Sequence, residues 1–425
     1  MDLRIMTKYV CGIDLHARKM TNCVMDRTGK IFLRKEVSNS IEEFLEIIKT
    51  WQNDITIGVE STYNWYWLID GLKTLKIPVY LGHALYIKRR CGLKHKTDPI
   101  DARHIADLLR TDKFPLAYAY PSEMRNVRDL LRRRHHLVRN RAGTYSHFNN
   151  TCNQHGYTKA LEGEAKRVST RREFPLKVTQ NEDVQKILST DIDCIESMDL
   201  VINSLEAYIG TKATLHNRTF FTTLLTIVGC GKITALTILY EMHTLDRFRS
   251  AQCFSSYCRV VRASNKSADK DYGRSSNDKI GNPYLKWALS EIVVHMIQQS
   301  ALIRAWYDNH VLRYGKGGTQ ARLRHKLAVT IYQMLKHNQI FDEYKFLGIQ
   351  NLQEQEEILT EQWTESSKQE LSEPKHKRNN PPCSIITKRN KTNIKTRQLI
   401  KTPGRITQLQ TGKCKVSTKS KATTA

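Results

Sequence analysis

The sequence predicts a mixed α/β domain at the N-terminus, then a helical region, and finally a polar, basic tail. Short apolar segments alternate with amphipathic ones over the first 120 residues, and strands that alternate with helices after an opening meander form mixed sheets. Further along, apolar residues recur at helical spacing, and beyond roughly residue 350 the composition turns polar. We therefore expect four regions, at residues 1–120, 121–215, 216–345 and 346–425, of which the last is disordered.

The opening residues predict three strands, YVCGIDLH, TNCVMD and KIFLRKEV. The intervening DRTGK is a hairpin turn in which Gly29 tolerates a positive φ. The segment SNSIEEFLEIIKTW predicts a helix, because Ser38 or Ser40 can cap it. Its apolar residues form one helical stripe, made of Ile41, Phe44, Leu45 and Ile48.

Four further elements complete the predicted N-terminal domain. ITIGVE is a strand that ends in an acid, NWYWLIDGLKTLK is a helix, PVYLGH is a strand, and TDPIDARHIADLLRT begins another helix. The order is three strands, helix, strand, helix, strand, helix. This is the order of the ribonuclease H-like fold, which many nucleases and transposases share, and at this point the likeness is an analogy of fold alone.

The middle of the chain predicts long helices. Apolar residues recur every seven positions at Leu188, Ile195, Ile202 and Ile209, with Met198 and Leu205 in a second row. This spacing is typical of a coiled coil, which either separates domains or joins subunits. The segment DLLRRRHHLVRNRAG is also helical and very basic, so one face either follows a phosphate backbone or is simply solvated.

The charge balance points to a polyanionic partner. Lys and Arg total 68 against 42 Asp and Glu, a net charge of +26. Residues 374–425 carry +14 and residues 351–373 carry −6, which leaves +18 for residues 1–350. The folded part is therefore basic without the tail. Because Lys and Arg replace the counterions condensed on nucleic acid, this excess favours a nucleic-acid partner.

The cysteines and the hydropathy predict a cytoplasmic protein. The ten Cys include no C-x-x-C pair, so we expect reduced thiols rather than a zinc site or a disulfide framework. The chain has no stretch of 18 apolar residues, and its first residues lack a long apolar core. We therefore expect no membrane partner and no secretion.

Four carboxylates stand where such a sheet places its ligands. Asp14 and Glu60 end apolar strands, and Asp98 and Asp101 open a helix. Ligands of α/β sheets bind at the edge formed by strand ends and helix starts. Carboxylates that meet there repel one another unless a cation neutralises them. Mg²⁺, or Mn²⁺, suits oxygen ligands and keeps water on the metal for attack on phosphate.

Each acid also has a purely structural interpretation. Asp98 precedes Pro99 and can be an N-cap, while Asp101 complements the helix dipole. Asp14 taken alone can be a turn residue. Glu60 is harder to explain in this way, because an acid that ends a buried strand needs a partner. The four acids together, on these elements, favour a metal site.

At these residues the sequence resembles the DEDD transposases of bacterial insertion sequences, the IS110 family, also called bridge recombinases. The resemblance covers roughly residues 8–300 in two blocks. In the first block it is carried by YVCGIDLHARK, ITIGVEST and LKHKTDPIDARHIADLLR. It implies a RuvC-like domain whose four acids are Asp14, Glu60, Asp98 and Asp101. The most distinctive matching residues are Lys96, Thr97, Asp98, Asp101, Ala102 and Ala106.

The second block contains a glycine turn and a serine loop. LLTIVGCGKITALTILYEM predicts helix, tight turn and helix, and the turn is either a phosphate-binding hairpin or an ordinary helical hairpin. Later, Asn282 caps a helix that has Pro283 at its first position. Three features of this block are similar to the family's C-terminal transposase domain: the string FSSYCR, a loop rich in Ser and Lys, and the string GNPYLKWAL.

The resemblance implies that a serine of this loop attacks DNA, and alignment places it at Ser267. Lys266, Lys270 or Arg274 would then stabilise the charge that develops on phosphate. The family has Gly within two residues after this serine, whereas Ala268 and Asp269 follow Ser267 here. Ser264 therefore remains the alternative nucleophile.

As a whole, the resemblance implies a transposase that exchanges DNA strands. The metal held by the four acids would assist Ser267 between subunits of a homo-oligomer, a dimer to tetramer. A structured non-coding bridge RNA would supply sequence choice, in the cytoplasm of a bacterial or archaeal cell and near its nucleoid. Two alternatives stay open at this point: a RuvC-like junction endonuclease that needs no serine, and a non-catalytic nucleic-acid-binding protein.

Overall fold

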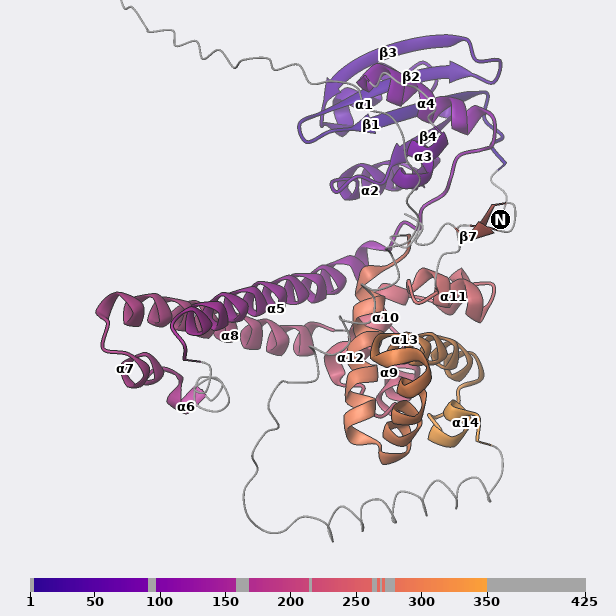
Figure 1. The fold of residues 1–425 in the computed structure, drawn as a ribbon. Helices are drawn as coiled ribbons and strands as arrows, with labels where there is room; N and C mark the ends of the chain where they lie inside the picture. Colours follow the sequence, from indigo (N-terminus) through magenta and orange to yellow (C-terminus); the bar gives the residue numbers. More distant parts are fainter. Residues whose placement is uncertain are drawn as a thin grey trace, which may run out of the picture. The chain divides into compact units, whose positions relative to one another are not determined.

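The computed structural model describes residues 4–90, 97–157, 168–213, 216–261, 266–267, 270–271 and 280–349. The predicted mixed α/β architecture is confirmed. A five-stranded sheet occupies the N-terminal part, and the described residues that follow are almost entirely helical (Figure 1). The predicted tail from residue 350 onward lies outside the described residues.

The sheet is mixed, with β1 at its centre. Its strands are β1 (Tyr9–Leu15), β2 (Lys19–Asp26), β3 (Ile31–Ser38), β4 (Ile55–Glu60) and β5 (Val79–Gly82), in the order β3-β2-β1-β4-β5. β1, β2 and β3 form an antiparallel meander, while β4 pairs in parallel with both β1 and β5. The carboxyl ends of β1, β4 and β5 therefore lie at one edge of the sheet.

The turn and the cap predicted in this meander are confirmed. Gly29 has a φ of +94°, and the Asp26 carboxylate accepts hydrogen bonds from the backbone N–H groups of Thr28 and Lys30. Helix α1 (Ile41–Ile48) is capped by Ser40, whose hydroxyl accepts from the N–H of Glu43. These local contacts fix the register of the strands on which Asp14 depends.

Helices cover both faces of the sheet. On one face, α1 and α2 (Tyr66–Thr74) pack against side chains of β1 such as Ile13 and Leu15. On the other, α4 (Asp98–Arg110) packs against Val10, Cys23 and Met25. The short helix α3 (Ala84–Arg90), which the sequence did not predict, follows β5, and a 3₁₀ turn (Gln52–Asp54) precedes β4. Alternate residues of β1 thus belong to two different cores.

Two long helices follow, as the seven-residue spacing predicts. α5 (Ser122–Gln154) and α8 (Glu182–Lys212) run side by side, with the short α6 (Val168–Arg171) and α7 (Phe174–Val178) between them in the chain (Figure 1). Arg134 of α5 pairs with Glu206 of α8 at 2.7 Å. The first row of the predicted seam of α8 is buried throughout, at Leu188, Ile195, Ile202 and Ile209. The second row, Met198 and Leu205, is partly buried.

The remaining described residues form a helical unit around one large core. Its helices are α9 (Arg218–Leu225), α10 (Lys232–Met242), α11 (Ala251–Tyr257), α12 (Pro283–Gln299), α13 (Ala301–His337) and α14 (Glu343–Leu347), with a 3₁₀ turn at Leu245–Arg247. The short strands β6 (Lys266–Ser267) and β7 (Lys270–Asp271) pair with each other. The predicted turn between α9 and α10 is confirmed, with Gly229 at a φ of +79°.

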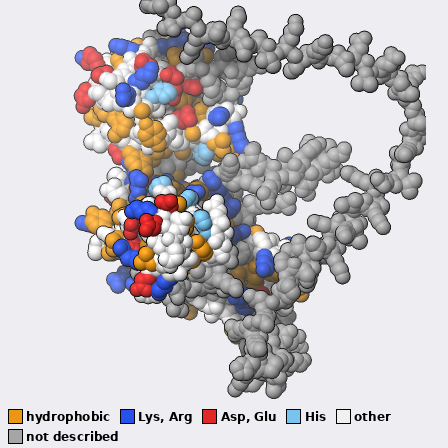
Figure 2. Space-filling view, turned by 60° about the vertical axis from the view of Figure 1, so that its left-hand side comes forward, with side chains coloured by type: hydrophobic (Ala, Val, Ile, Leu, Met, Phe, Trp, Pro, Cys, Tyr) orange, Lys and Arg blue, Asp and Glu red, His pale blue; other side chains and the backbone are white. Residues whose placement is uncertain are grey.

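On the face that Figure 2 shows, Lys and Arg side chains are interspersed with Asp and Glu rather than gathered into one patch. Among the described helices, none combines the length and the apolar character needed to cross a bilayer. The seven cysteines in the described parts are all free thiols.

Candidate active site

Asp14 and Glu60 stand next to each other at the carboxyl edge of the sheet. Ile13 pairs with Val59 in the parallel ladder between β1 and β4, and each acid is the next residue along its strand. Because side chains alternate between the two faces, both acids project to the same face as Gly12 and Gly58. That face is the one that α4 covers. The sheet alone therefore places two carboxylates beneath one helix.

Glycines in both strands let α4 approach this face closely. A Cβ atom built on Gly12 would lie 2.2 Å from the carbonyl oxygen of Ala102 and 2.4 Å from the amide nitrogen of Ala106. A Cβ on Gly58 would lie 2.6 Å from a methyl carbon of Leu109. Only glycine fits where backbone packs on backbone at this distance. The close approach brings the first turn of α4 to the edge where Asp14 lies.

Asp98 does not cap α4, so that structural interpretation is wrong. The N-cap residue is Thr97, and its side chain makes no capping hydrogen bond. Asp98 is the first residue of the helix, and Pro99 follows it. Asp101 also lies in the first turn, where a negative charge interacts favourably with the helix dipole. The Asp98 carboxylate lies instead beside the side chain of the residue that follows β1.

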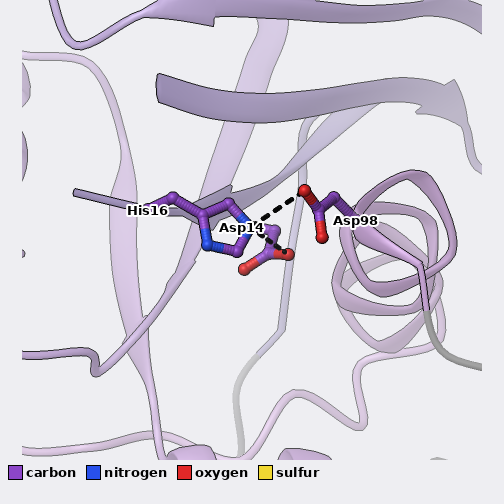
Figure 3. Close-up of side chains that lie close together, drawn as sticks. All are labelled: Asp14, His16 and Asp98. Atoms are coloured by element: carbon purple, nitrogen blue, oxygen red, sulfur yellow. Dashed lines mark ion pairs between the residues drawn. The ribbon is translucent and has the colours of Figure 1, made fainter. Parts of the chain in front are cut away.

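That side chain is His16, which sequence reasoning did not single out. Its Nε2 atom lies 3.2 Å from Oδ2 of Asp14 and 3.3 Å from Oδ2 of Asp98. Figure 3 shows one nitrogen of the imidazole facing both carboxylates, that of Asp14 on β1 and that of Asp98 on α4. One donor atom from each of these three residues lies within 4.8 Å of the other two. The sequence signal was present in GIDLH, two residues after Asp14.

Burial and like charge make the cluster suited to a cation. Burial raises the pKa of Asp14 above its usual value, His16 opposes this rise, and the carboxylates of Asp101 and Asp98 add to it. Asp14 is 8% exposed, so water does little to screen it. A carboxylate that burial and neighbouring acids destabilise gains most from a bound cation. The donor set therefore fits a divalent metal ion.

The four predicted acids are not equally close. Asp14 and Asp98 share the three-residue cluster with His16, and the charge of Asp101 acts on Asp14. Glu60 ends β4 beside Asp14 but is not a member of that cluster. The structure thus brings two of the four into one donor set and leaves Glu60 and Asp101 at its border.

The predicted nucleophile lies on β6, in the two-stranded sheet. Ser267 is the last residue of β6 and pairs with Lys270 of β7. Of the residues in β6 and β7, only the backbone is described. Ser264 and Arg274, which the sequence also singled out, lie outside the described residues.

The two ends of the serine loop are joined by described contacts. The N–H of Asn282 donates to the carbonyl of Tyr257 at 2.6 Å, and Arg259 Nε donates to the carbonyl of Gly281 at 2.8 Å. Gly281 has a φ of +102°, and a Cβ there would lie 2.4 Å from the Tyr257 carbonyl oxygen. Asn282 then caps α12, as predicted, by accepting from the N–H groups of Tyr284 and Leu285.

A buried carboxylate beneath this junction was not predicted. Glu241 of α10 is 1% exposed and binds Arg132 through both of its oxygens, at 2.5 and 2.8 Å. It also accepts from Arg128 at 3.0 Å and from the side-chain amide of Asn282 at 2.7 Å. Burial opposes ionisation, but these partners outweigh it and lower the pKa of Glu241. The Glu241 carboxylate thus links α10 to the arginines of α5 and to Asn282, the residue at the end of the serine loop.

Comparison with known families agrees with the sequence resemblance. Residues 11–155 match the model of the DEDD transposases of IS110, described as a transposase, and residues 222–308 match that of the transposase IS116/IS110/IS902 family. The two matches cover 145 and 87 residues, more than half of the 425 in the chain. No curated protein matches the chain. The first match contains the four acids and His16, and the second contains Glu241 and the serine loop. The chain belongs to the IS110 family of transposases.

Proposed function

We propose that this transposase cleaves and exchanges DNA strands for an insertion sequence, through a serine–DNA intermediate that a metal-binding acid cluster assists. The observation that carries the proposal is the meeting of Asp14 and Asp98 at the carboxyl edge of the sheet. The order β3-β2-β1-β4-β5 and the element order support a RuvC-like, ribonuclease H-like fold for this domain. In such a fold the acids lie where phosphate chemistry takes place.

In this mechanism the acid cluster holds the reacting phosphate group. Asp14, Glu60, Asp98 and Asp101 would hold Mg²⁺ or Mn²⁺, which when bound neutralises charge that develops on phosphate oxygens. Burial of Asp14 and the close packing of α4 on Gly12 keep the carboxylates in place before substrate arrives. Preorganised groups of this kind need no rearrangement at the moment of reaction.

The serine would conserve the energy of the cleaved bond. The hydroxyl oxygen of Ser267 bonds to phosphorus, the bond from phosphorus to one deoxyribose oxygen breaks, and that oxygen leaves as a hydroxyl with the serine proton. The product is a phosphodiester between Ser267 and one DNA end. A hydroxyl from the exchanged strand reverses the step, so rejoining requires no ATP.

The proposed partners are DNA, a structured bridge RNA and further copies of the chain. The charge of +18 on residues 1–350 supports contact with nucleic-acid backbones. Apolar side chains exposed on α8, with Leu200 at 73% and Val201 at 50%, support assembly of a dimer or tetramer through the helical pair. Light scattering of the purified chain, with and without RNA, measures that assembly directly.

The test of this function is denaturing electrophoresis after incubation with element-end DNA and co-purified RNA. Wild type should give a protein–DNA adduct, and both Ser267→Ala and Asp14→Ala should abolish it. The matched control is Ser256→Ala, an exposed serine on α11 outside the loop, which should retain the adduct. If Ser264→Ala alone loses the adduct, the nucleophile is Ser264.

A junction endonuclease would behave differently in the same assay. It would produce free 5′-phosphate ends without an adduct, and Ser267→Ala would cleave as the wild type does. Loss of cleavage in Asp14→Ala would then assign the whole reaction to the acid cluster.

A further inference from the structure

We infer that His16 is a nitrogen ligand of the metal site, which gives the site a preference for Mn²⁺ over Mg²⁺. The inference rests on the metal-dependent function proposed above, and it concerns a residue outside the four acids. It follows from the position of the imidazole, from the spacing of the donor atoms and from the way the backbone of His16 is held.

The imidazole nitrogen of His16 faces two carboxylates at ion-pair distance. Nε2 of His16 is buried and has no hydrogen-bond partner, although carboxylate oxygens of Asp14 and Asp98 lie 3.2 and 3.3 Å away. The ring direction therefore makes neither contact a hydrogen bond. The three side chains thus converge on one point, and a cation between them would bind all three in place of the ion pairs.

The spacing of the donor atoms is close to that of neighbouring ligands on one ion. Octahedral ligands at 2.0–2.1 Å from a metal lie roughly 3 Å from each other. The separations from His16 to Asp14 and to Asp98 exceed this by only a few tenths of an ångström. Small side-chain adjustments would therefore complete the coordination.

The backbone of His16 is fixed from three directions. Its carbonyl accepts from the side-chain amides of Asn64 at 2.7 Å and Asn39 at 3.0 Å, and its N–H donates to the carbonyl of Lys19 at 2.9 Å. The hydroxyl of Thr62 donates to Oδ1 of Asn64 at 2.9 Å, which orients that amide. Because Asn64 follows the end of β4, the imidazole is positioned by the same two strands that carry Asp14 and Glu60.

The nitrogen determines which ion the site prefers. Carboxylates suit Mg²⁺ and Mn²⁺ alike, whereas imidazole suits transition metals and adds little for Mg²⁺. With His16 as a ligand, Mn²⁺ should bind more tightly than Mg²⁺, and the difference should disappear when the imidazole is removed. The four acids without His16 would show no such difference.

The experiment is titration calorimetry with MnCl₂ and MgCl₂, together with pulsed electron paramagnetic resonance of the Mn²⁺ complex. Wild type should show ¹⁴N modulation from a directly bound imidazole. In both His16→Ala and His16→Gln the modulation should vanish, and Mn²⁺ affinity should fall by about tenfold or more. Mutation of a residue that only supports a ligand already lowers metal affinity by about 10–100-fold. Mg²⁺ affinity should change little. The matched control is His325→Ala, an exposed histidine on α13.

The outcomes separate this inference from the proposed function. Mn²⁺ binding without ¹⁴N modulation in wild type would overturn the role of His16 and leave the acid site intact. In that case His16 only contacts the carboxylates and is not a ligand. If neither wild type nor Asp14→Ala gives a binding heat with either metal, the metal site itself is overturned, and the role of His16 with it.

Discussion

Because α4 approaches β1 so closely, the single methyl group added by Gly12→Ala should have a large effect on stability and on the acid cluster. The added Cβ would lie 2.2 Å from the Ala102 carbonyl oxygen, and both nearest atoms belong to the backbone of α4. Moving this contact to 3.0 Å, the shortest distance that real Cβ atoms tolerate, displaces the helix by about 0.8 Å. Overpacking of this kind costs about 1–3 kcal/mol of stability.

The same displacement should affect chemistry more than folding. Asp98 and Asp101 lie on α4 and move with it, away from Asp14 on the fixed strand. A misplacement near 1 Å can cost about 100-fold in rate, so strand cleavage should fall by about that factor while the protein still folds. Metal affinity should fall as well, because the carboxylates would no longer share one ion.

The assay compares Gly12→Ala with Gly143→Ala. Gly143 lies within α5, and a Cβ there meets nothing within 4 Å. Alanine in a helix interior is about 0.5–1 kcal/mol more favourable than glycine, so this control should be slightly more stable than wild type. Urea unfolding measures stability, and Mn²⁺ titration and adduct formation measure the site. Wild-type stability and wild-type metal affinity in Gly12→Ala would refute the packing argument.

Three further substitutions test the surrounding contacts. Asn64→Ala removes the 2.7 Å hydrogen bond to the His16 carbonyl, and calorimetry should show Mn²⁺ affinity about tenfold weaker; unchanged affinity would mean that Asn64 does not position the imidazole. Glu241→Gln breaks a buried ion pair and should cost about 3–5 kcal/mol in urea unfolding at pH 7. Because the folded-state pKa of Glu241 lies below its usual value near 4.5, its stabilisation is present above that pH and is lost as pH falls through the folded pKa. The wild type and Glu241→Gln should therefore converge in acid, and a constant difference down to pH 3 would contradict the ion-pair explanation. Asn282→Ala removes the cap of α12 and should cost about 0.5–2 kcal/mol, seen as a lower urea midpoint; an unchanged midpoint would show that the cap contributes nothing.

Much of the fold could be predicted because its signals are local. The strands follow from short apolar segments, the turn at Gly29 from its sequence, and the cap of α12 from Asn282 and Pro283. Helix α3 was missed because it is only seven residues long and directly follows a strand, where no cap or apolar stripe marks its beginning. Short helices take their stability from tertiary packing, which a local pattern does not contain.

The site could be predicted only where its residues carry charge at recognisable positions. Asp14 and Glu60 were predictable because strand ends meet at one edge of a sheet. His16 follows Asp14 by two residues but was not singled out, because only its second partner, Asp98, makes it part of a cluster. Glu241 was not predictable because its partners are far away in the chain. Asp98 lies 82 residues beyond His16, and Arg128 lies 113 residues before Glu241. The cap interpretation of Asp98 was reasonable locally and failed because the helix begins at Asp98 itself, which leaves Thr97 as the N-cap residue.

The contacts between Tyr257 and Asn282 have a consequence for how this domain can change during evolution. They close the loop independently of the residues inside it, since Asn282 is held by α12, Glu241 and the Tyr257 carbonyl. Once its ends are joined, doubling the length of a loop costs only about 0.6 kcal/mol. Insertions and deletions between the two ends should therefore lower the stability of the helices beneath only slightly. The segment that carries Ser267, the proposed nucleophile, can diversify while the helices that hold its ends stay the same.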